Sequence, residues 1–376
     1  MKVIFTIDTL ANSGAETSTL DIISNFSKDI EVKVIYFYPQ HDLKSAYENK
    51  NIPLIYLDYP NRYSIIKGSQ KLKNILENEK PDLVVSCLYR ANIMSRIACK
   101  LSGILLMGTF VSDSYSNQRT AIFSLKKKIA FKFYYFIDRF TVNIPIGWIA
   151  NSKYIKHSNA KHLKLREDKI SVIYRGRNSK LFPIKEFSIS TNNFTFVSIG
   201  RLLETKGLLE LVNAFYNVYQ VNKNVRLLIY GEGSFRGELE QIIHQLNIAD
   251  CVNLMGNEPN AYLKLSEANC FVFPSWYEGF SGALVEAMMT GIPIIASDIP
   301  MNLEAVENEK TALIHQVKDS HDIANKMKQM ISDYDKMIEM GKRARKVAIE
   351  KFDIREIAVQ YEKTLKRIVN ENQKNS

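Results

Sequence analysis

The chain has 376 residues, of which 46% are hydrophobic and 24% charged, so it is a globular protein long enough for two domains. Its net charge of +10 indicates an anionic partner: a phosphorylated substrate, an anionic membrane surface or nucleic acid. The four scattered cysteines exclude a disulfide-rich scaffold, and the absence of a long apolar run excludes a membrane-spanning segment.

Short apolar runs alternate with longer segments of helical period from the start of the chain to residue 174. This alternation is typical of repeated β-α units around a parallel sheet. The expected strands are 3–7, 32–38, 54–57, 83–87, 105–111, 147–150 and 170–174, and the expected helices are 15–26, 65–79, 91–101 and 120–140.

A polar, irregular stretch containing Pro183 follows, and we interpret it as a domain linker. The alternation then begins again, which predicts a second parallel sheet. A cleft between two such sheets would let strand ends and helix starts meet a ligand. The strands expected in this half are 194–199, 225–230, 252–255, 271–273 and 293–296, and the helices are 207–219, 235–246, 261–268, 282–290 and 321–351.

The most informative segment is 274–288, which reads PSWYEGFSGALVEAM. A loop with Glu278 and two glycines precedes a helix that is expected to begin near Ser281 or Gly282. Backbone N–H groups at a helix start suit a diphosphate, and glycines let a ligand approach closely. Glu278 and Glu286 could face one pocket and accept hydrogen bonds from sugar hydroxyls. The alternative is that Glu278 only interacts favourably with the helix dipole and that Glu286 is an ordinary solvated helix residue.

Two other strand-to-helix turns carry candidate phosphate ligands. Arg201 and Lys206 follow the first strand of the second half, beside Gly200, and could clamp a diphosphate; the alternative is a pair of surface cations. The turn SGAE near the start of the chain places Gly14 at a helix N-terminus. A single glycine is common in such turns, so this motif is weak by itself.

In chain order, these motifs are SGAE at 13–16, GRL at 200–202 with KG at 206–207, GEG at 231–233, the E-x7-E pair, and ASD at 296–298. Their order and spacing resemble those of the retaining GT-B glycosyltransferases of family 4, over most of the chain. The resemblance implies an α/β fold with two Rossmann-like parallel-sheet domains facing a central cleft. The implied parts are an acceptor-binding domain at 1–180, a linker at 181–193, a donor-binding domain at 194–351 and a helix at 352–376 that crosses back to the N-terminal domain.

The resemblance also implies a role for individual residues. Glu286 would bind the ribose hydroxyls of a nucleotide-sugar donor, and Glu278 would bind hydroxyls of the transferred sugar. Arg201 and Lys206 would neutralise the diphosphate, helped by the backbone at Gly14. The rest of the implied donor site consists of Gly279, Phe280, Ser281 and Gly282 along the sugar and phosphate, with Gly231, Gly233 and Met255 beside a uracil base.

These residues predict chemistry without a metal or another cofactor. Departure of the diphosphate leaves positive charge on the sugar and negative charge on the leaving group, which fixed cations and a helix N-terminus can stabilise. The D-x-D sequence at 333–335 matches a metal motif of another glycosyltransferase fold, but it falls in a polar helical segment rather than at a strand end.

The sequence departs from the family pattern at two places. Many relatives have a His or Arg after the fifth N-terminal strand, where this chain reads FVSDSY at 110–115. Asp113 could take that catalytic position, or the role could be absent. The family's Asn-Gly-X-Asp turn is altered to RGRN at 175–178.

The segment 123–140 combines five cations with seven aromatic residues. A basic aromatic helix suits an anionic membrane interface and would bring the enzyme to a lipid-linked acceptor. The alternative is a core-facing helix with a basic solvent face. Nucleic acid is the less favoured partner because no recognised binding module accompanies the charge.

We therefore expect a glycosyltransferase that moves a hexose or N-acetylhexosamine from a UDP-sugar to a glycan or lipid-linked acceptor in cell-surface polysaccharide biosynthesis. It would be cytoplasmic and peripheral at the inner face of the plasma membrane. Two alternatives stay open: a GT-B sugar-nucleotide epimerase or phosphorylase, and a non-catalytic GT-B protein that binds nucleotide or glycan.

Overall fold

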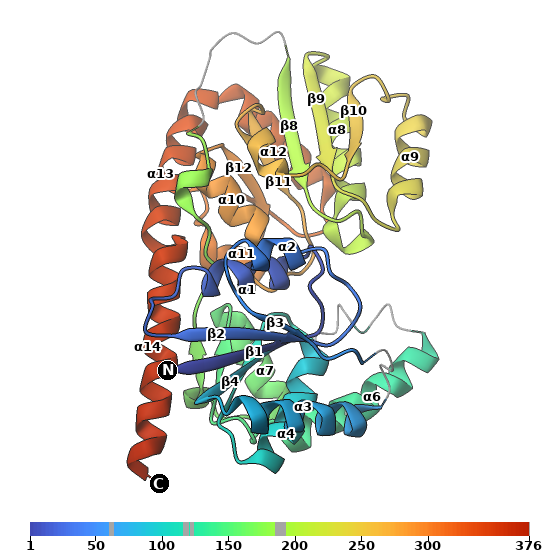
Figure 1. Cartoon of the computed structure of the whole chain (residues 1–376). Helices are drawn as coiled ribbons and strands as arrows, with labels where there is room; N and C mark the ends of the chain where they lie inside the picture. The colour runs from blue at the N-terminus through green and yellow to red at the C-terminus, as the bar shows by residue number, and fades with distance from the viewer. Residues whose placement is uncertain (60–63, 116–119, 121–123, 185–192, 376) are drawn as a thin grey trace. The chain divides into compact units, whose positions relative to one another are not determined.

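The computed structural model describes residues 1–59, 64–115, 120, 124–184 and 193–375 (Figure 1). The chain divides into two compact units. Unit 1 comprises Met1–Gly176 and Ile354–Ser376, and unit 2 comprises Arg177–Asp353. Residues 185–192 of the predicted linker lie outside the described residues.

Unit 1 is built on a seven-stranded parallel sheet in the order β3-β2-β1-β4-β5-β6-β7. The direction of winding reverses between β1 and β4, and ligands bind beyond the carboxyl ends of strands at such a point. Strands β4 and β5 are buried along their whole length, as expected for a sheet covered on both faces. The strands are β1 (Lys2–Ile7), β2 (Glu31–Tyr36), β3 (Leu54–Tyr56), β4 (Leu83–Cys87), β5 (Leu106–Phe110), β6 (Gly147–Ala150) and β7 (Ile170–Val172).

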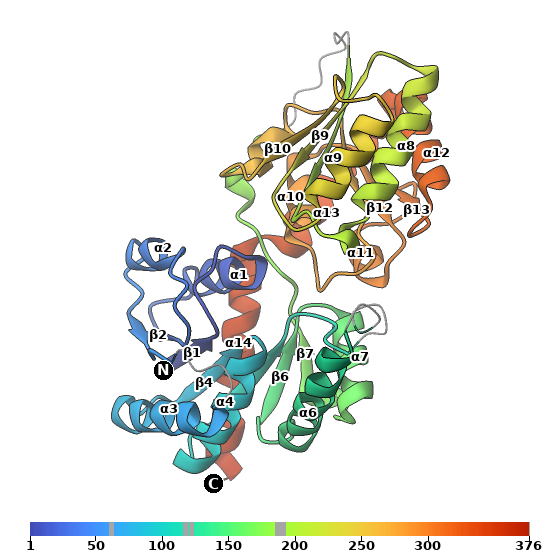
Figure 2. The ribbon, with the colours of Figure 1, turned by 90° about the vertical axis from the view of Figure 1, so that its right-hand side faces the viewer.

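Helices cover both faces of this sheet (Figures 1 and 2). Alternate residues of β1 face opposite sides: Phe5 packs with residues of α1 and α14, whereas Ile4 packs with residues of α3 and α4. Thus the last helix of the chain completes the core of unit 1. The helices are α1 (Gly14–Ile23), α2 (Lys44–Glu48), α3 (Ile65–Glu79), α4 (Tyr89–Ser102), α6 (Leu125–Thr141), α7 (Lys153–Leu163) and α14 (Ile354–Asn375).

Unit 2 contains a six-stranded parallel sheet in the order β10-β9-β8-β11-β12-β13. Its winding reverses between β8 and β11. Helices α8, α9 and α12 lie on one face, where Met337 and Met340 at the start of α13 join the same core, and α10 lies on the other face (Figure 2). The strands are β8 (Phe194–Ile199), β9 (Val225–Tyr230), β10 (Val252–Gly256), β11 (Cys270–Phe273), β12 (Ile294–Ser297) and β13 (Leu313–His315), and the helices are α8 (Leu208–Val221), α9 (Arg236–Gln245), α10 (Gly282–Thr290), α11 (Pro300–Ala305), α12 (Ser320–Ser332) and α13 (Tyr334–Phe352).

The single helix predicted at 321–351 is wrong, because it is two helices that meet at Asp333. This residue has non-helical backbone angles of φ −113° and ψ 33°. Tyr334 then packs its ring 5.0 Å from that of Phe194 and donates its hydroxyl to the Asn269 carbonyl at 3.2 Å. These tertiary contacts keep the two helices separate at Asp333. The D-x-D sequence is located at this junction.

Further differences concern mostly short or irregular elements. The helix predicted at 261–268 is a short 3-10 helix, η4 (Ala261–Leu265). Within the range predicted as one helix at 120–140, residues 121–123 lie outside the described residues and α6 begins at Leu125. Helices α2, α7 and α11 and strand β13 were not predicted. None of the described helices is long and apolar enough to cross a membrane.

Candidate active site

Helix α10 and the loop before it form the centre of the candidate donor site in unit 2. Ser281 caps the helix: its hydroxyl accepts the Leu284 N–H at 3.4 Å. The other N–H groups of the first turn have no partner within the helix and direct partial positive charge outward. The loop that carries Glu278 therefore leads directly into a site suited to an anion.

Glu278 forms an ion pair with Lys206, and the two side chains are only 15% and 19% exposed. Lys206 ends the short helix η3 (Glu204–Lys206), which follows β8. The next residue, Gly207, has φ +67°, and a Cβ there would lie 2.1 Å from the Pro274 carbonyl oxygen. Only glycine permits this approach, so Gly207 brings the loops after β8 and β11 together.

Glu286 is paired with Arg177, whose Nε lies 2.6 Å from Oε1 of the glutamate. The Arg177 guanidinium also lies over the start of α10, where a Cβ at Gly282 would come within 2.0 Å of Nη2. The sequence marked the turn at 175–178 only as a departure from the family pattern. Arg177 is thus a candidate site residue that sequence reasoning missed, because its partner is 109 positions away.

Of two further residues predicted at the donor site, Arg201 is exposed and Phe280 is buried. Arg201 is exposed at the carboxyl end of β8, where its guanidinium can reach a ligand. Phe280 is 1% exposed and packs against Phe352 with ring centroids 5.2 Å apart. Its side chain belongs to the core, and only its backbone, like that of the neighbouring Gly279, is available to line a donor site.

The residues predicted beside the base lie at the same edge of the sheet in unit 2. Gly231 donates its N–H to the Gly256 carbonyl at 2.7 Å and has φ +137°. A Cβ at Gly231 would lie 1.9 Å from the Gly200 oxygen, and one at Gly233 would lie 2.1 Å from the Leu202 oxygen. Close packing of two loops thus accounts for both glycines. Met255 is 47% exposed near the end of β10.

Gly14 and Asp113 belong to unit 1. Gly14 begins α1, and a Cβ there would lie 3.0 Å from Nη1 of Arg175, so a guanidinium lies against this helix start. Asp113 is 4% exposed and accepts a hydrogen bond of 2.7 Å from Ser158. This contact gives Asp113 a structural role in holding α7. The geometry provides no support for its predicted catalytic role.

A pocket of about 190 Å³ lies at the winding reversal of the sheet in unit 1. It is lined by polar groups at the carboxyl ends of β1, β4 and β5, including Asp8, Asn92 and Ser112. Burial raises the pKa of Asp8 to about 6, although hydrogen bonds from backbone N–H groups, among them that of Ala91 at 2.6 Å, oppose the shift. The pocket therefore offers a carboxyl group that changes charge near neutral pH.

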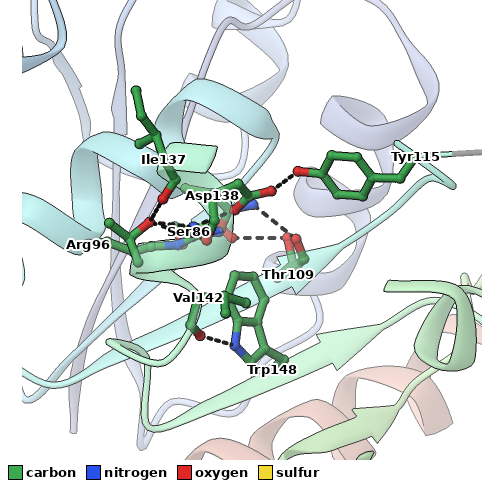
Figure 3. Close-up of polar contacts among 10 residues, drawn as sticks. Ser86, Arg96, Thr109, Tyr115, Ile137, Asp138, Val142 and Trp148 are labelled. Carbon is green, nitrogen blue, oxygen red and sulfur yellow. Dashed lines mark hydrogen bonds and ion pairs between the residues drawn. The ribbon is translucent and has the colours of Figure 1, made fainter. Parts of the chain in front are cut away.

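A buried polar network forms one wall of this pocket (Figure 3). Arg96, 1% exposed, forms an ion pair with Asp138 of α6 and donates to the Thr141 hydroxyl at 2.9 Å. Tyr115 donates its hydroxyl to the same aspartate, and burial, followed by the negative charge of Asp138, raises its pKa. Trp148 lies 4.8 Å from the Arg96 guanidinium. The available sequence signal was a single acidic residue, Asp138, within the basic aromatic sequence of α6.

Two Rossmann-like units with functional loops at strand carboxyl ends define the GT-B class of glycosyltransferases. The crystal structure of HepE from Anabaena in complex with UDP and glucose has this fold, with a TM-score of 0.83 at 22% identity, covering 97% of this chain and 99% of that chain. The predicted fold class is confirmed.

Sequence comparisons identify the family. The profile described as Glycosyltransferase Family 4 matches residues 12–181, and the profile described as Glycosyl transferases group 1 matches residues 182–347. The chain therefore belongs to glycosyltransferase family 4 and is a transferase enzyme, as predicted.

Curated relatives are glycosyltransferases of polysaccharide and lipid-linked glycan assembly. The capsular polysaccharide biosynthesis glycosyltransferase CapM of Staphylococcus aureus is 24% identical over 77% of this chain and 78% of its own length. The UDP-Gal:alpha-D-GlcNAc-diphosphoundecaprenol alpha-1,3-galactosyltransferase of Escherichia coli is 26% identical over 77% of this chain and 76% of its own length.

Proposed function

We propose that this enzyme transfers a hexose or N-acetylhexosamine from a UDP-sugar to a glycan or lipid-linked acceptor, with retention of anomeric configuration, in cell-surface polysaccharide biosynthesis. The observation that carries the proposal is the convergence of Glu278, Glu286, Lys206 and Arg177 at the start of α10. Both acids and both bases are largely buried, which is costly unless they are paired or serve a ligand.

The two ion pairs supply the chemical groups that a nucleotide sugar requires. Each carboxyl group can accept hydrogen bonds from vicinal hydroxyls, with Glu286 on the ribose and Glu278 on the sugar. When a donor binds, Lys206 and the exposed Arg201 would turn toward its diphosphate, where N–H groups of α10 also point. The UDP named for HepE and the UDP-Gal named for the Escherichia coli enzyme support a uridine donor.

The reaction step is cleavage of the bond between the anomeric carbon and the diphosphate oxygen, with formation of a bond to an acceptor hydroxyl oxygen. The bonding pair leaves with the UDP, and its phosphate oxygen would take the acceptor proton. Lys206 and Arg201, once turned toward the diphosphate, and the start of α10 stabilise the charge that develops on this leaving group, so we propose that neither a metal nor another cofactor is required.

The acceptor would bind to unit 1, whose pocket at the winding reversal contains Asp8 and several neutral hydrogen-bonding groups. Such groups suit the hydroxyls of a glycan. The diphosphoundecaprenol acceptor named for the Escherichia coli relative supports a lipid-linked acceptor and a cytoplasmic location at the inner face of the plasma membrane.

A donor panel with mixed acceptors tests the proposal by release of nucleoside diphosphate. We expect release from a UDP-sugar, unchanged by EDTA, and a loss of about 10- to 100-fold in kcat/KM for Glu286→Ala, as for a lost hydrogen bond to a charged group. Glu350→Ala is the control, because that glutamate is exposed on α13. Absence of nucleotide binding, or an unaffected Glu286→Ala variant, contradicts the proposed donor site.

A further inference from the structure

Helix α6 exposes a row of large apolar side chains. Leu125, Ile129, Phe133, Phe136 and Phe140 are 75%, 64%, 62%, 56% and 82% exposed. Single exposed apolar residues are ordinary on a protein surface, but five on one helix of 17 residues form a continuous patch. We call this set the α6 stripe. Phe123, at the start of the predicted basic segment, lies outside the described residues.

The α6 stripe is the outer face of the helix. At 3.6 residues per turn, its five positions fall within an arc of about 80°. The inward-facing residues are centred roughly on the opposite side of the helix, about 180° away. These inward residues are Phe131, Tyr134, Tyr135 and Asp138.

Strong contacts hold the inner face of α6 to unit 1. Asp138 forms its buried ion pair with Arg96 (Figure 3). The Tyr135 hydroxyl donates to the His162 carbonyl at 2.8 Å. The ring of Tyr135 packs edge-on against that of Tyr115, with centroids 5.3 Å apart. Among the described residues, these anchoring contacts come from the inner face, whereas the side chains of the α6 stripe are exposed and are available to a partner.

Exposed cations border the stripe on both sides. Lys126 lies on one side, and Lys128 and Lys132 lie on the other, each within about 60° of the edge of the apolar arc. An apolar face bordered by cations complements a surface that is apolar inside and anionic at its boundary. That combination describes an anionic bilayer rather than the exposed face of another globular protein.

We propose that the α6 stripe docks unit 1 on an anionic lipid bilayer, with its apolar side chains among the acyl chains and the lysines at the lipid phosphates. Asp138 connects this surface with the pocket of unit 1, since it lies on the inner face of α6 and lines the pocket. Docking would hold the pocket about one helix diameter, roughly 10–12 Å, from the lipid. This inference deepens the proposed function, because a lipid-linked acceptor is presented at that surface.

Vesicle flotation of the full chain tests the docking surface. We expect the wild type to float with vesicles containing 30 mol% phosphatidylglycerol and to stay unbound with pure phosphatidylcholine. Neutralising Lys126, Lys128 and Lys132 to Gln should lower the partition coefficient about 100-fold at low salt, at about fivefold for each cation. Replacing Phe133, Phe136 and Phe140 with Ser should abolish flotation, because the apolar contact is lost.

Matched variants test the position of the surface. Ile66 and Leu101 are also exposed apolar residues of unit 1, at 79% and 57%, and their replacement with Ser should leave flotation unchanged. Exposed Lys50, Lys100 and Lys161, changed to Gln, are the charge control. Far-UV circular dichroism and thermal unfolding verify that every variant is folded.

The proposal is overturned if the wild type fails to float, or if the serine variant floats as well as the wild type. Self-association that the serine variant abolishes, without vesicle binding by the wild type, would instead assign the stripe to a second copy of the chain. Flotation needs no donor or turnover, so its failure is distinguishable from failure of the proposed transferase activity.

Discussion

The charged residues of the candidate sites are held by partners distant in sequence. Lys206 and Glu278 are separated by 72 positions, and Arg96 and Asp138 by 42. A buried charge pair is strongly disfavoured when one partner is removed, because the other is left uncompensated. Single substitutions in these pairs should therefore affect folding as well as ligand binding, and tests of function need a measurement of stability beside them.

The pKa of Asp8 predicts how its carboxyl group affects stability as pH changes. Burial raises this pKa from 3.8 to about 6, with Glu16 adding to the shift and Arg90 opposing it. The folded state thus binds this proton more tightly than the unfolded state, so the contribution of Asp8 to stability decreases as pH rises from about 4 to 6. The decrease is at most about 3 kcal/mol, and less where pocket water screens the charge.

Chemical denaturation between pH 4 and pH 7 measures this effect. The unfolding free energy of Asp8→Asn should decline less over the range than that of the wild type, since the substituted side chain does not titrate. Exposed Asp250, changed to Asn, serves as the control. If the unfolding free energies of wild type and Asp8→Asn change with pH in the same way, the raised pKa of Asp8 is contradicted.

At the scale of elements, the sites depend on loops that follow strand ends and on the glycines that let those loops approach. The loops after β8, β9 and β11 contact each other through Gly207, Gly231 and Gly233, where a Cβ would meet a carbonyl oxygen at 2.1, 1.9 and 2.1 Å. Motif comparison alone assigns Gly231 and Gly233 to ligand contact. The structure adds a packing reason for both, and it gives one for Gly207 as well.

Gly207→Ala should destabilise unit 2 and weaken nucleotide binding. The new Cβ would clash with Pro274, and φ of +67° adds a strain of roughly 1–2 kcal/mol. Gly237→Ala is the matched control: it lies in α9, where an added Cβ meets nothing within 4 Å, and helix propensity should stabilise it by about 0.5–1 kcal/mol. Urea unfolding measures the stability of each variant, and UDP titration measures its nucleotide affinity. Equal stability and equal affinity of the two variants would show that the loop contact is unimportant.

At the scale of the molecule, unit 1 is discontinuous in sequence. The chain leaves it after Gly176 and returns at Ile354, and these residues lie together: a Cβ at Gly176 would be 2.9 Å from the Ile354 Cα. Helix α14 then contributes Tyr361 and Leu365 to the core around β1. Folding of unit 1 consequently requires both ends of the chain.

Leu365→Ala should destabilise unit 1 by about 2–5 kcal/mol, because the side chain is fully buried and its removal leaves a cavity. Val359→Ala, 43% exposed on the same helix, should change stability by less than about 1 kcal/mol. Thermal unfolding measures both, while UDP titration reports on unit 2. An unchanged unfolding transition for Leu365→Ala would contradict the role of α14 in the core.

Periodicity and motif spacing in the sequence predicted several features of the protein without the tertiary structure. Alternating strand and helix periods are local properties, so they predicted two parallel-sheet domains. The order and spacing of five motifs, among them the Glu278 and Glu286 pair, predicted the family. Short or irregular elements such as α2, α7 and β13 were missed, because three to eleven residues carry little periodic signal beside their tertiary contacts.

The partners of charged side chains depended on the folded chain. Glu286 was recognised in the sequence, but its pairing with Arg177 arises only when a turn 109 positions away packs over α10. Likewise, the sequence of the basic segment 123–140 was equally consistent with a helix that binds a membrane and with a helix that faces the core. Folding distinguishes the two faces of α6, because Arg96 and its neighbours hold the inner one and leave the apolar row outside.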